Sequence, residues 1–281
     1  MTKKKEPTFS VLMSVYKNDN PEHLKLALES IYEKQTKKPD EIVIVFDGPL
    51  TREQLGVLDE FRRNKKNIVN YYPQKENKGL GEALRIGTER CKCDYIFRMD
   101  SDDISAPMRF EIQSKYIEKH KNIDVLGTSI AEFINSPEEN NKKIRVCPKK
   151  QRDIIQWAKK RNPMNHMTVC IKRKSLIEAG GYKTLKYMED YYLWIRMISH
   201  GFILENINKP LVYARIGNGF IERRNSKAQI DGWKVINDYM LQRKMITKKE
   251  SIINTVSRNI FIFLPGFAKK LIYGKFLRKN G

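Results

Sequence analysis

The 281-residue chain carries a formal net charge of +21, and 40% of its residues are hydrophobic. This composition can bury the core of one large α/β domain, with or without an appendage, and it excludes wholesale disorder. No run reaches the roughly 18 apolar residues of a membrane-spanning helix, and the charged start, 1–7, lacks the apolar segment of a secretory signal.

The cysteines and the net charge indicate the cellular compartment and the class of partner of the protein. The four cysteines form neither a CxxC pair nor a regular framework, so we expect reduced thiols, a cytoplasmic protein and no zinc site. The positive charge indicates a nucleic acid, a phospholipid surface or a phosphorylated substrate as partner, unless it only keeps a lysine-rich chain soluble. Residues 246–281 hold eight Lys and Arg against one Glu, so the end of the chain is strongly basic.

Strand and helix patterns alternate through the first 130 residues. A strand over Phe9–Val15 precedes a helix that begins at Pro21, with Asn20 as its N-cap. A second strand and a helix opened by a capping box come next, at Glu41–Phe46 and Thr51–Gln54. A third strand, a third helix and a fourth strand follow, over Ile68–Tyr72, Leu80–Cys91 and Tyr95–Met99. This alternation predicts a doubly wound parallel sheet whose ligands gather at the carboxyl ends of its strands.

The alternation breaks after one more strand, over Asp124–Phe133. Ser136–Lys143 is polar and predicts a surface loop, and 149–161 is a basic, partly helical segment. Glu189–His200 has helical periodicity and ends at Gly201, a typical helix stop. This half of the chain is less regular than the first.

Acidic or polar residues follow three of the predicted strands. Ser14–Tyr16, Asp47 and Asp100–Asp103 stand at strand ends that meet in one crevice of a doubly wound sheet. A single Asp after a strand usually only caps the next helix. Here polar or acidic residues follow three strands, and Asp100–Asp103 holds three carboxylates within four residues, which favours a ligand-binding site. Mutual repulsion in Asp100–Asp103 would be relieved by Mg²⁺ or Mn²⁺, which take carboxylate and phosphate oxygens.

In order and spacing, these motifs resemble those of the family 2 glycosyltransferases with a GT-A fold. The resemblance covers about residues 8–215 and rests on Val11–Tyr16, Glu41–Gly48, Asn77–Leu80, Phe97–Asp103 and Glu189–Asp190. It implies an α/β, Rossmann-like, mixed but mostly parallel sheet flanked by helices. The catalytic domain would span 1–245, with a nucleotide-binding half at about 8–133 and an acceptor half at about 134–220.

The resemblance also implies roles for single residues. Those expected to bind the nucleotide sugar are Ser14, Tyr16, Asp47, Asn77, Gly79, Asp100 and Ser101. Asp47 would read the uracil edge, and Asp102 would hold the divalent metal, Mn²⁺ or Mg²⁺. Asp103 would cap the next helix or pair with Arg109. Phe46 before Asp47, where a second acid is common, and Arg85, where Asn is commoner, indicate a subgroup with its own donor preference.

The acceptor side is expected around Glu189 and Asp190. The resemblance makes Asp190 the base of an inverting transfer, with Glu189 as its alternative or orienting partner, whereas the residues alone fit equally well two acids at a helix N-terminus. His166 would contact the acceptor or the diphosphate unless it is structural. Trp194 either offers a face to a sugar or belongs to the core.

The last segment, 246–281, mixes apolar and basic residues around the run Ile260–Leu264. This mixture favours a helical tail docked on an anionic membrane surface, with packing on the catalytic domain as the alternative. We therefore expect an inverting transferase that moves a hexose from a UDP-sugar to a lipid-linked oligosaccharide of an O-antigen or capsule type of polysaccharide. It would work at the cytoplasmic face of the cell membrane, without a nucleic-acid partner.

Three other functions are less favoured. A metal-dependent nucleotidyl or sugar-phosphate transferase would be expected to carry a Gly-rich phosphate loop followed by lysine, which is missing after the first strand. An RNA-binding protein would need exposed aromatic residues among the basic ones, and the aromatic residues here fit core or tail positions. A non-catalytic membrane scaffold would not need the acidic motifs.

Overall fold

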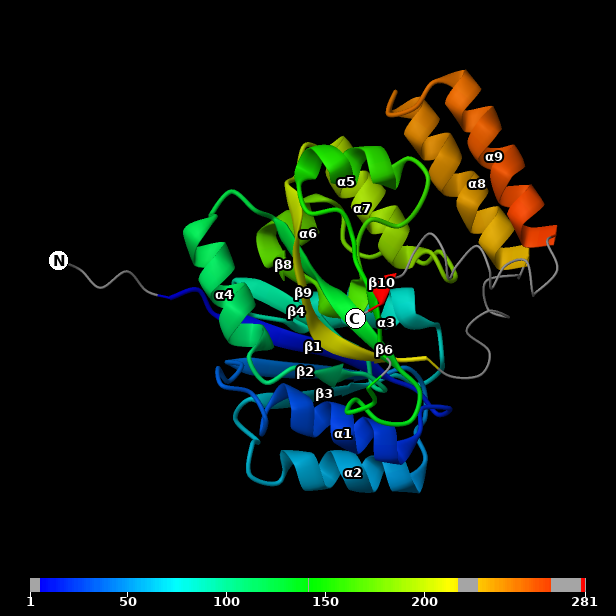
Figure 1. The fold of residues 1–281 in the computed structure, drawn as a ribbon. Helices are drawn as coiled ribbons and strands as arrows, with labels where there is room; N and C mark the ends of the chain where they lie inside the picture. The colour runs from blue at the N-terminus through cyan, green and yellow to red at the C-terminus, as the bar shows by residue number, and fades with distance from the viewer. Residues whose placement is uncertain (1–5, 141, 217–226, 264–278, 281) are drawn as a thin grey trace.

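The computed structural model describes residues 6–140, 142–216, 227–263 and 279–280 (Figure 1). The first four strands pair in parallel and are β1 (Phe9–Val15), β2 (Glu41–Phe46), β3 (Val69–Pro73) and β4 (Tyr95–Met99). The other strands are β5 (Ile104–Ser105), β6 (Val125–Phe133), β7 (Lys143–Arg145), β8 (Cys170–Lys172), β9 (Leu204–Arg215) and β10 (Lys279–Asn280). The main sheet has the order β10-β7-β6-β8-β4-β1-β2-β3, and β9 pairs with β5 and β6.

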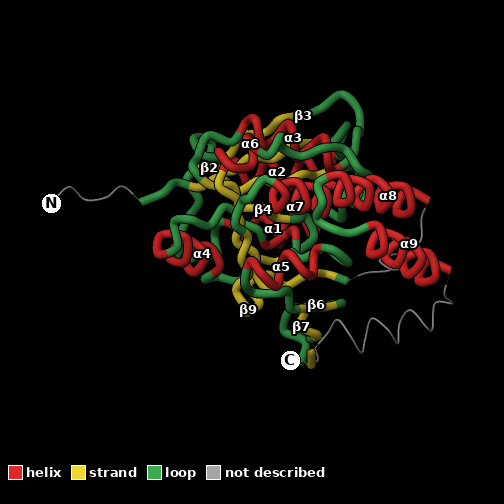
Figure 2. Tube along the Cα trace, turned by 90° about the horizontal axis from the view of Figure 1, so that it is seen from above, coloured by secondary structure: helices red, strands yellow, loops and turns green. Residues whose placement is uncertain are grey.

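Helices cover both faces of this sheet (Figures 1 and 2). Before β6 they are α1 (Pro21–Ile31), α2 (Arg52–Arg62), α3 (Leu80–Arg90) and α4 (Arg109–Lys119). After β6 they are α5 (Gln151–Ala158), α6 (Arg173–Glu178), α7 (Glu189–Ser199), α8 (Lys227–Gln242) and α9 (Lys248–Phe263), with a 3₁₀ turn at His166–Thr168. In the described ranges, no helix combines the length and apolar character needed to cross a bilayer.

Alternating side chains of β1 and β2 divide the core into two clusters. Leu12 and Val43 point to the face covered by α3, α6 and α7, whereas Met13 and Ile44 point to the face covered by α1, α2 and α4. A strand that is buried on both faces needs apolar residues at successive positions. The near-continuous apolar runs of the sequence therefore predicted these parallel strands correctly.

The predicted helix starts are confirmed. The Asn20 side chain accepts hydrogen bonds from two N–H groups of α1, and Thr51 and Gln54 form a reciprocal capping box at the start of α2. The doubly wound pattern holds only for the first four strands, because β8 runs antiparallel to β4 and to β6. The sheet therefore contains both parallel and antiparallel pairs, as expected for a GT-A fold. A simple alternation of strands and helices would give parallel pairs alone.

The segment that follows residue 245 begins in the hydrophobic core. Ile246 is buried in the cluster that covers α7 and α8. Helix α9 then packs beside α8, where Asn237 Nδ2 donates to Ser251 Oγ over 2.7 Å. The first half of the predicted tail thus contacts the rest of the chain. Residues 264–278, which carry much of its expected membrane-binding character, lie outside the described residues.

Candidate active site

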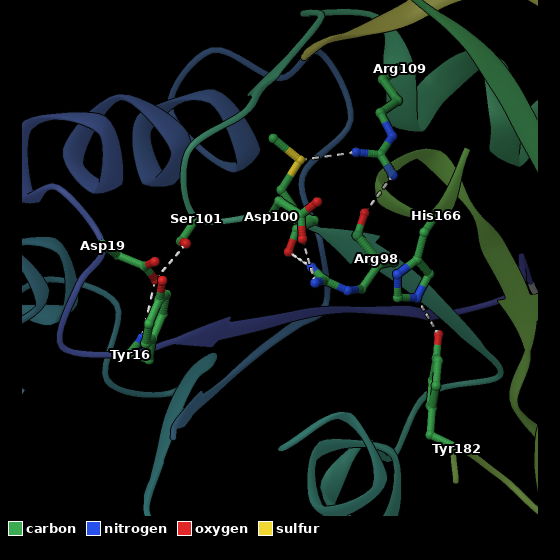
Figure 3. Close-up of polar contacts among 9 residues, drawn as sticks. Tyr16, Asp19, Arg98, Asp100, Ser101, Arg109, His166 and Tyr182 are labelled. Carbon is green, nitrogen blue, oxygen red and sulfur yellow. Dashed lines mark hydrogen bonds and ion pairs between the residues drawn. The ribbon is translucent and has the colours of Figure 1, made fainter. Parts of the chain in front are cut away.

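Two loops at the carboxyl ends of β1 and β4 are joined by a hydrogen bond. Ser101 Oγ donates to Asp19 Oδ2 over 2.7 Å, and the same carboxylate oxygen accepts the Tyr16 N–H over 3.1 Å (Figure 3). Gln54 Nε2 donates to the carbonyls of Tyr16 and Asp19 over 2.9 and 2.6 Å. The loop after β1 is therefore held both by α2 and by the acidic segment after β4.

Asp19 was not among the residues predicted from the sequence. Burial raises its pKa to about 6, although the hydrogen bonds from Ser101 and Tyr16 act in the opposite direction. An acid four positions after the end of β1 was the available signal, comparable to Asp47 directly after β2. Its partner could not be read from the sequence, because the two segments meet only through the pairing of β1 with β4.

The acidic segment after β4 brings three carboxylates together. One oxygen each from Asp100, Asp102 and Asp103 lie within 4.8 Å of one another. Asp103 is buried, and burial together with the negative charges of Asp102 and Asp100 raises its pKa well above the ordinary value. Its Oδ1 accepts the Arg215 N–H over 2.8 Å, and its Oδ2 has no hydrogen-bond partner among the described residues.

The expectation that Asp103 caps the next helix is corrected, because the residue at the N-cap of α4 is Met108, without a side-chain cap. The negative charge of Asp103 does act on the Arg109 guanidinium. That guanidinium donates hydrogen bonds to the Arg98 carbonyl over 2.7 Å and to Gln113 Oε1 over 3.0 Å. Asp103 holds the end of β9, which returns beside the acidic segment, through the backbone of Arg215.

The donor set of this cluster fits a hard divalent cation. Mg²⁺ and Mn²⁺ prefer carboxylate oxygens, and the cluster offers three, one of them with a buried oxygen that lacks a hydrogen bond within the described ranges. Asp102, the most exposed of the three, would hold the ion, with Asp100 and Asp103 beside it. Bound there, such an ion would supply positive charge to a diphosphate.

A buried arginine lies directly beneath the acidic segment. Arg98, on β4, is 2% exposed, and its guanidinium pairs with Asp100 and donates to the Met99 carbonyl (Figure 3). Burial and the positive charge of Arg98 lower the pKa of His166 well below its ordinary range. Arg98 therefore compensates part of the acidic charge, and its own charge adds to the burial that favours the neutral His166 ring.

His166 and Trp194, the two residues expected on the acceptor side, differ in their contacts and burial. His166 Nε2 lies 2.9 Å from the Tyr182 hydroxyl (Figure 3), and its ring is in edge-to-face contact with Trp194, with 6.1 Å between centroids. Trp194 is 0% exposed, so it has no ring face to offer to a sugar. The expectation of a stacking role is corrected, and Trp194 belongs to the core.

Asp47 binds the loop that precedes α3. Its Oδ1 accepts the Lys78 N–H over 2.8 Å, and its Oδ2 accepts the Gly79 N–H over 3.0 Å. Gly48 has φ +87°, and a Cβ there would stand 2.8 Å from the Asn77 nitrogen. Both features bring the segment containing Asn77 and Gly79 against the end of β2. Ser14 is half-buried near the end of β1.

The second acidic motif stands at the start of α7. Asp190 Oδ2 accepts from Asn162 Nδ2 over 2.5 Å, and Oδ1 accepts the Tyr191 N–H over 2.7 Å. Burial raises the pKa of Asp190 even though the bond from Asn162 lowers it. Burial raises the pKa of Glu189 to about 7, and within the described residues its Oε2 has no hydrogen-bond partner.

The charges of both acidic motifs act on the buried Tyr182. Burial raises the pKa of its hydroxyl, and the nearby charges of Asp190 and Asp100 act on it as well. Both motifs therefore lie in the electrostatic neighbourhood of one buried side chain. Neither Tyr182 nor Asn162 was predicted, because a single Tyr or Asn in a loop carries no pattern of its own.

Comparison with known proteins decides the family. The model of glycosyl transferase family 2 matches residues 10–181. The chain belongs to glycosyltransferase family 2. This confirms the resemblance inferred from the motifs and establishes the chain as a glycosyltransferase.

Two relatives and one solved structure agree with this assignment. An uncharacterised glycosyltransferase of Haemophilus influenzae is 38% identical over 96% of both chains. The UDP-Gal:alpha-D-GlcNAc-diphosphoundecaprenol beta-1,3-galactosyltransferase of Escherichia coli is 35% identical over 97% of this chain and 98% of its own. The crystal structure of S. aureus TarS 1-349 in complex with UDP-GlcNAc superposes with a TM-score of 0.68 at 17% identity, covering 96% of this chain and 76% of that one. The likeness to TarS confirms the GT-A fold.

Proposed function

We propose that this family 2 glycosyltransferase moves a hexose from a UDP-sugar, with inversion, to a lipid-linked saccharide in the synthesis of a cell-surface polysaccharide. The observation that carries the proposal is the pairing of segments at the carboxyl ends of the parallel strands. The Ser101–Asp19 bond joins the segments after β1 and β4, and the Asp47–Gly79 bond joins those after β2 and β3. A UDP donor and a diphospholipid acceptor are supported by the Escherichia coli galactosyltransferase, of which this chain matches 98%.

On the donor side, Tyr16 and Ser14 would flank the uridine, and Asp47 would read the uracil edge. Because both Asp47 oxygens also accept backbone N–H groups of the loop at Lys78 and Gly79, this residue would set the position of that loop at the same time. Asp100, anchored by Arg98, would face the ribose and diphosphate. Asp102 would hold Mn²⁺ or Mg²⁺, which would neutralise charge on the leaving diphosphate.

On the acceptor side, Asp190 would take the proton of the attacking sugar hydroxyl. Asn162 and the Tyr191 N–H orient its carboxylate, and burial makes it a better proton acceptor by raising its pKa. Glu189 is the alternative base, since its pKa of about 7 also suits proton transfer near neutral pH. His166, bonded to Tyr182, would contact the acceptor or the diphosphate.

The enzyme would work on the cytoplasmic face of the membrane that holds its acceptor, as a peripheral protein. This setting is supported by the acceptor class of the Escherichia coli relative and by the high positive charge of the chain, which suits anionic lipid. A nucleic-acid partner is not needed to account for that charge.

The test is a transfer assay with purified protein and Mn²⁺. Each of several UDP-hexoses, UDP-galactose among them, is offered with a diphospholipid-linked N-acetylhexosamine, and the product is analysed by NMR for the anomeric configuration of the new bond. One UDP-hexose should give an inverted glycoside. No transfer from any UDP-sugar, or a retained configuration, would contradict the proposal.

A further inference from the structure

Among the described side chains of helix α9, three large apolar ones are exposed, whereas the polar Asn254 is buried against the protein. Ile252, Ile253 and Val256 are 65%, 52% and 51% exposed. Asn254 is buried on the other side, and its Nδ2 donates to the Lys159 carbonyl over 2.9 Å. A surface helix of a globular domain normally turns its apolar stripe to the core. The outer face of α9 is therefore apolar surface that the described part of the chain leaves uncovered.

Polar contacts on the inner face fix the rotation of α9. Arg258 Nη2 donates to Gln229 Oε1 over 3.1 Å, and the Arg258 guanidinium lies 4.9 Å from the centroid of the Trp233 ring. Asn237 adds the bond to Ser251 described above. Because these contacts all come from α8, a rotation that buried the apolar residues would break them. The outward position of the apolar residues is thus a property of the packed helix.

Positive side chains adjoin this apolar face. Arg243, Lys244, Lys248 and Lys249 are exposed, and no acidic residue occurs in 243–249. With about 3.6 residues per turn, Lys248 and Lys249 lie one turn before Ile252 and Ile253 on the same side of α9. Figures 1 and 2 show the α8–α9 pair at one edge of the molecule, beside α7 and away from β1–β3.

We propose that the α9 face, formed by Lys248, Lys249, Ile252, Ile253 and Val256, docks on an anionic lipid bilayer. The inference rests on the proposed function, which puts the lipid of the acceptor in a membrane. Branched apolar side chains would enter the boundary between headgroups and acyl chains, while the lysines meet lipid phosphates. A second copy of the chain fits less well, because two such faces would bring like charges together.

The experiment is co-sedimentation of the full chain with vesicles of phosphatidylglycerol and phosphatidylcholine, or of phosphatidylcholine alone. The wild type should bind the anionic vesicles, and added salt should weaken binding. The variant Ile252→Ser/Ile253→Ser/Val256→Ser should lower the partition coefficient by about tenfold or more. Lys248→Gln/Lys249→Gln should weaken binding and its salt dependence. The matched control is Leu26→Ser/Leu55→Ser on α1 and α2, which removes side chains that are 38% and 40% exposed and should bind as the wild type does.

Other outcomes would overturn the proposal. The proposal fails if the wild type does not bind anionic vesicles, or if the triple serine variant binds them as strongly as the wild type does. Light scattering adds another test, because wild-type self-association that the triple variant abolishes, with vesicle binding intact, would make the face an interface between copies. Stabilisation by UDP with Mn²⁺, measured without vesicles, should be the same in all variants. If wild type and variants alike lack that stabilisation, the proposed function fails while lipid docking is still judged by the vesicles.

Discussion

The Ser101 hydroxyl donates a 2.7 Å hydrogen bond to the carboxylate of Asp19, a residue 82 positions earlier in the chain. The bond ties the loop after β1 to the acidic segment after β4, so the proposed uridine and diphosphate regions are mechanically linked. Because burial raises the pKa of Asp19 to about 6, the ionised, strongly accepting form predominates only above that pH.

This link predicts coupled effects of Ser101→Ala and Asp19→Ala. Each single variant should weaken UDP binding by a few-fold, and the double variant should be little worse than either, with a coupling of about 1 kcal/mol. Calorimetric titration of UDP in the presence of Mn²⁺ measures all four proteins at pH 7.5. Additive losses would mean that the two residues act independently.

Asp102→Asn should abolish metal-dependent donor turnover while the protein stays folded. The amide keeps the shape but removes a negative charge that the cation needs, so turnover of the UDP-sugar should fall by roughly 100-fold or more. Stabilisation by Mn²⁺ with UDP should also disappear in thermal denaturation. Asp153→Asn, which alters an exposed acid on α5, is the control and should resemble the wild type. Normal turnover by Asp102→Asn would move the metal elsewhere.

Asp190→Asn and Glu189→Gln should separate the two candidate bases. If Asp190 takes the proton, Asp190→Asn should bind UDP and Mn²⁺ normally and lose transfer by about 100-fold or more, whereas Glu189→Gln should retain more of it. Initial rates with saturating donor and acceptor give the comparison. The opposite order would assign the base to Glu189.

Glu189 should also make stability depend on pH. Burial raises its pKa from 4.5 to about 7, so the folded state binds the proton more tightly than the unfolded state. Its contribution to the free energy of unfolding is present below about pH 4.5 and is lost as the pH rises to about 7. Relative to the wild type, Glu189→Gln should therefore gain stability over this range, by roughly 1–3 kcal/mol. Urea unfolding from pH 5 to 8 measures this, with Glu60→Gln at an exposed site as control; a constant difference would contradict it.

Gly48→Ala should be destabilising, whereas Gly56→Ala should not. The φ of +87° at Gly48 and the 2.8 Å that would separate an added Cβ from the Asn77 nitrogen cost an alanine about 1–3 kcal/mol. UDP binding should weaken too, since the loop before α3 would shift. Gly56 lies inside α2 with nothing within 4 Å of such a Cβ, so alanine there should stabilise by up to about 1 kcal/mol. Thermal unfolding of both variants gives the comparison.

The parallel half of the fold was predictable because its strands are buried on both faces. β1, β2 and β4 coincide with apolar runs in the sequence, and the capping residues Asn20 and Thr51 mark the helices between them. The strands β7 and β8 have three residues each, too few for an alternating pattern to stand out. Both pair with β6, and β8 also pairs with β4, so their existence depends on tertiary structure.

The acidic motifs of the site were predictable, and the residues that hold them were not. Asp47 and Asp102 directly follow or nearly follow strands, where a sequence pattern marks them. In the sequence, Arg98 only interrupts the apolar run of β4. In the structure its pairing with Asp100 explains why a charged residue is buried there. Asn162 acts through a contact with Asp190, 28 positions away, that only the packing of α7 creates.

The Gln54 side chain forms hydrogen bonds both at the start of α2 and in the loop after β1, so these two segments should open together. Its Oε1 accepts the Thr51 N–H at the start of α2, while its Nε2 donates to the carbonyls of Tyr16 and Asp19. Unwinding of the first turn of α2 would therefore release the β1 loop in the same event. Amide protons in these two places should exchange with solvent at similar free energies of opening, and a bound nucleotide should slow both.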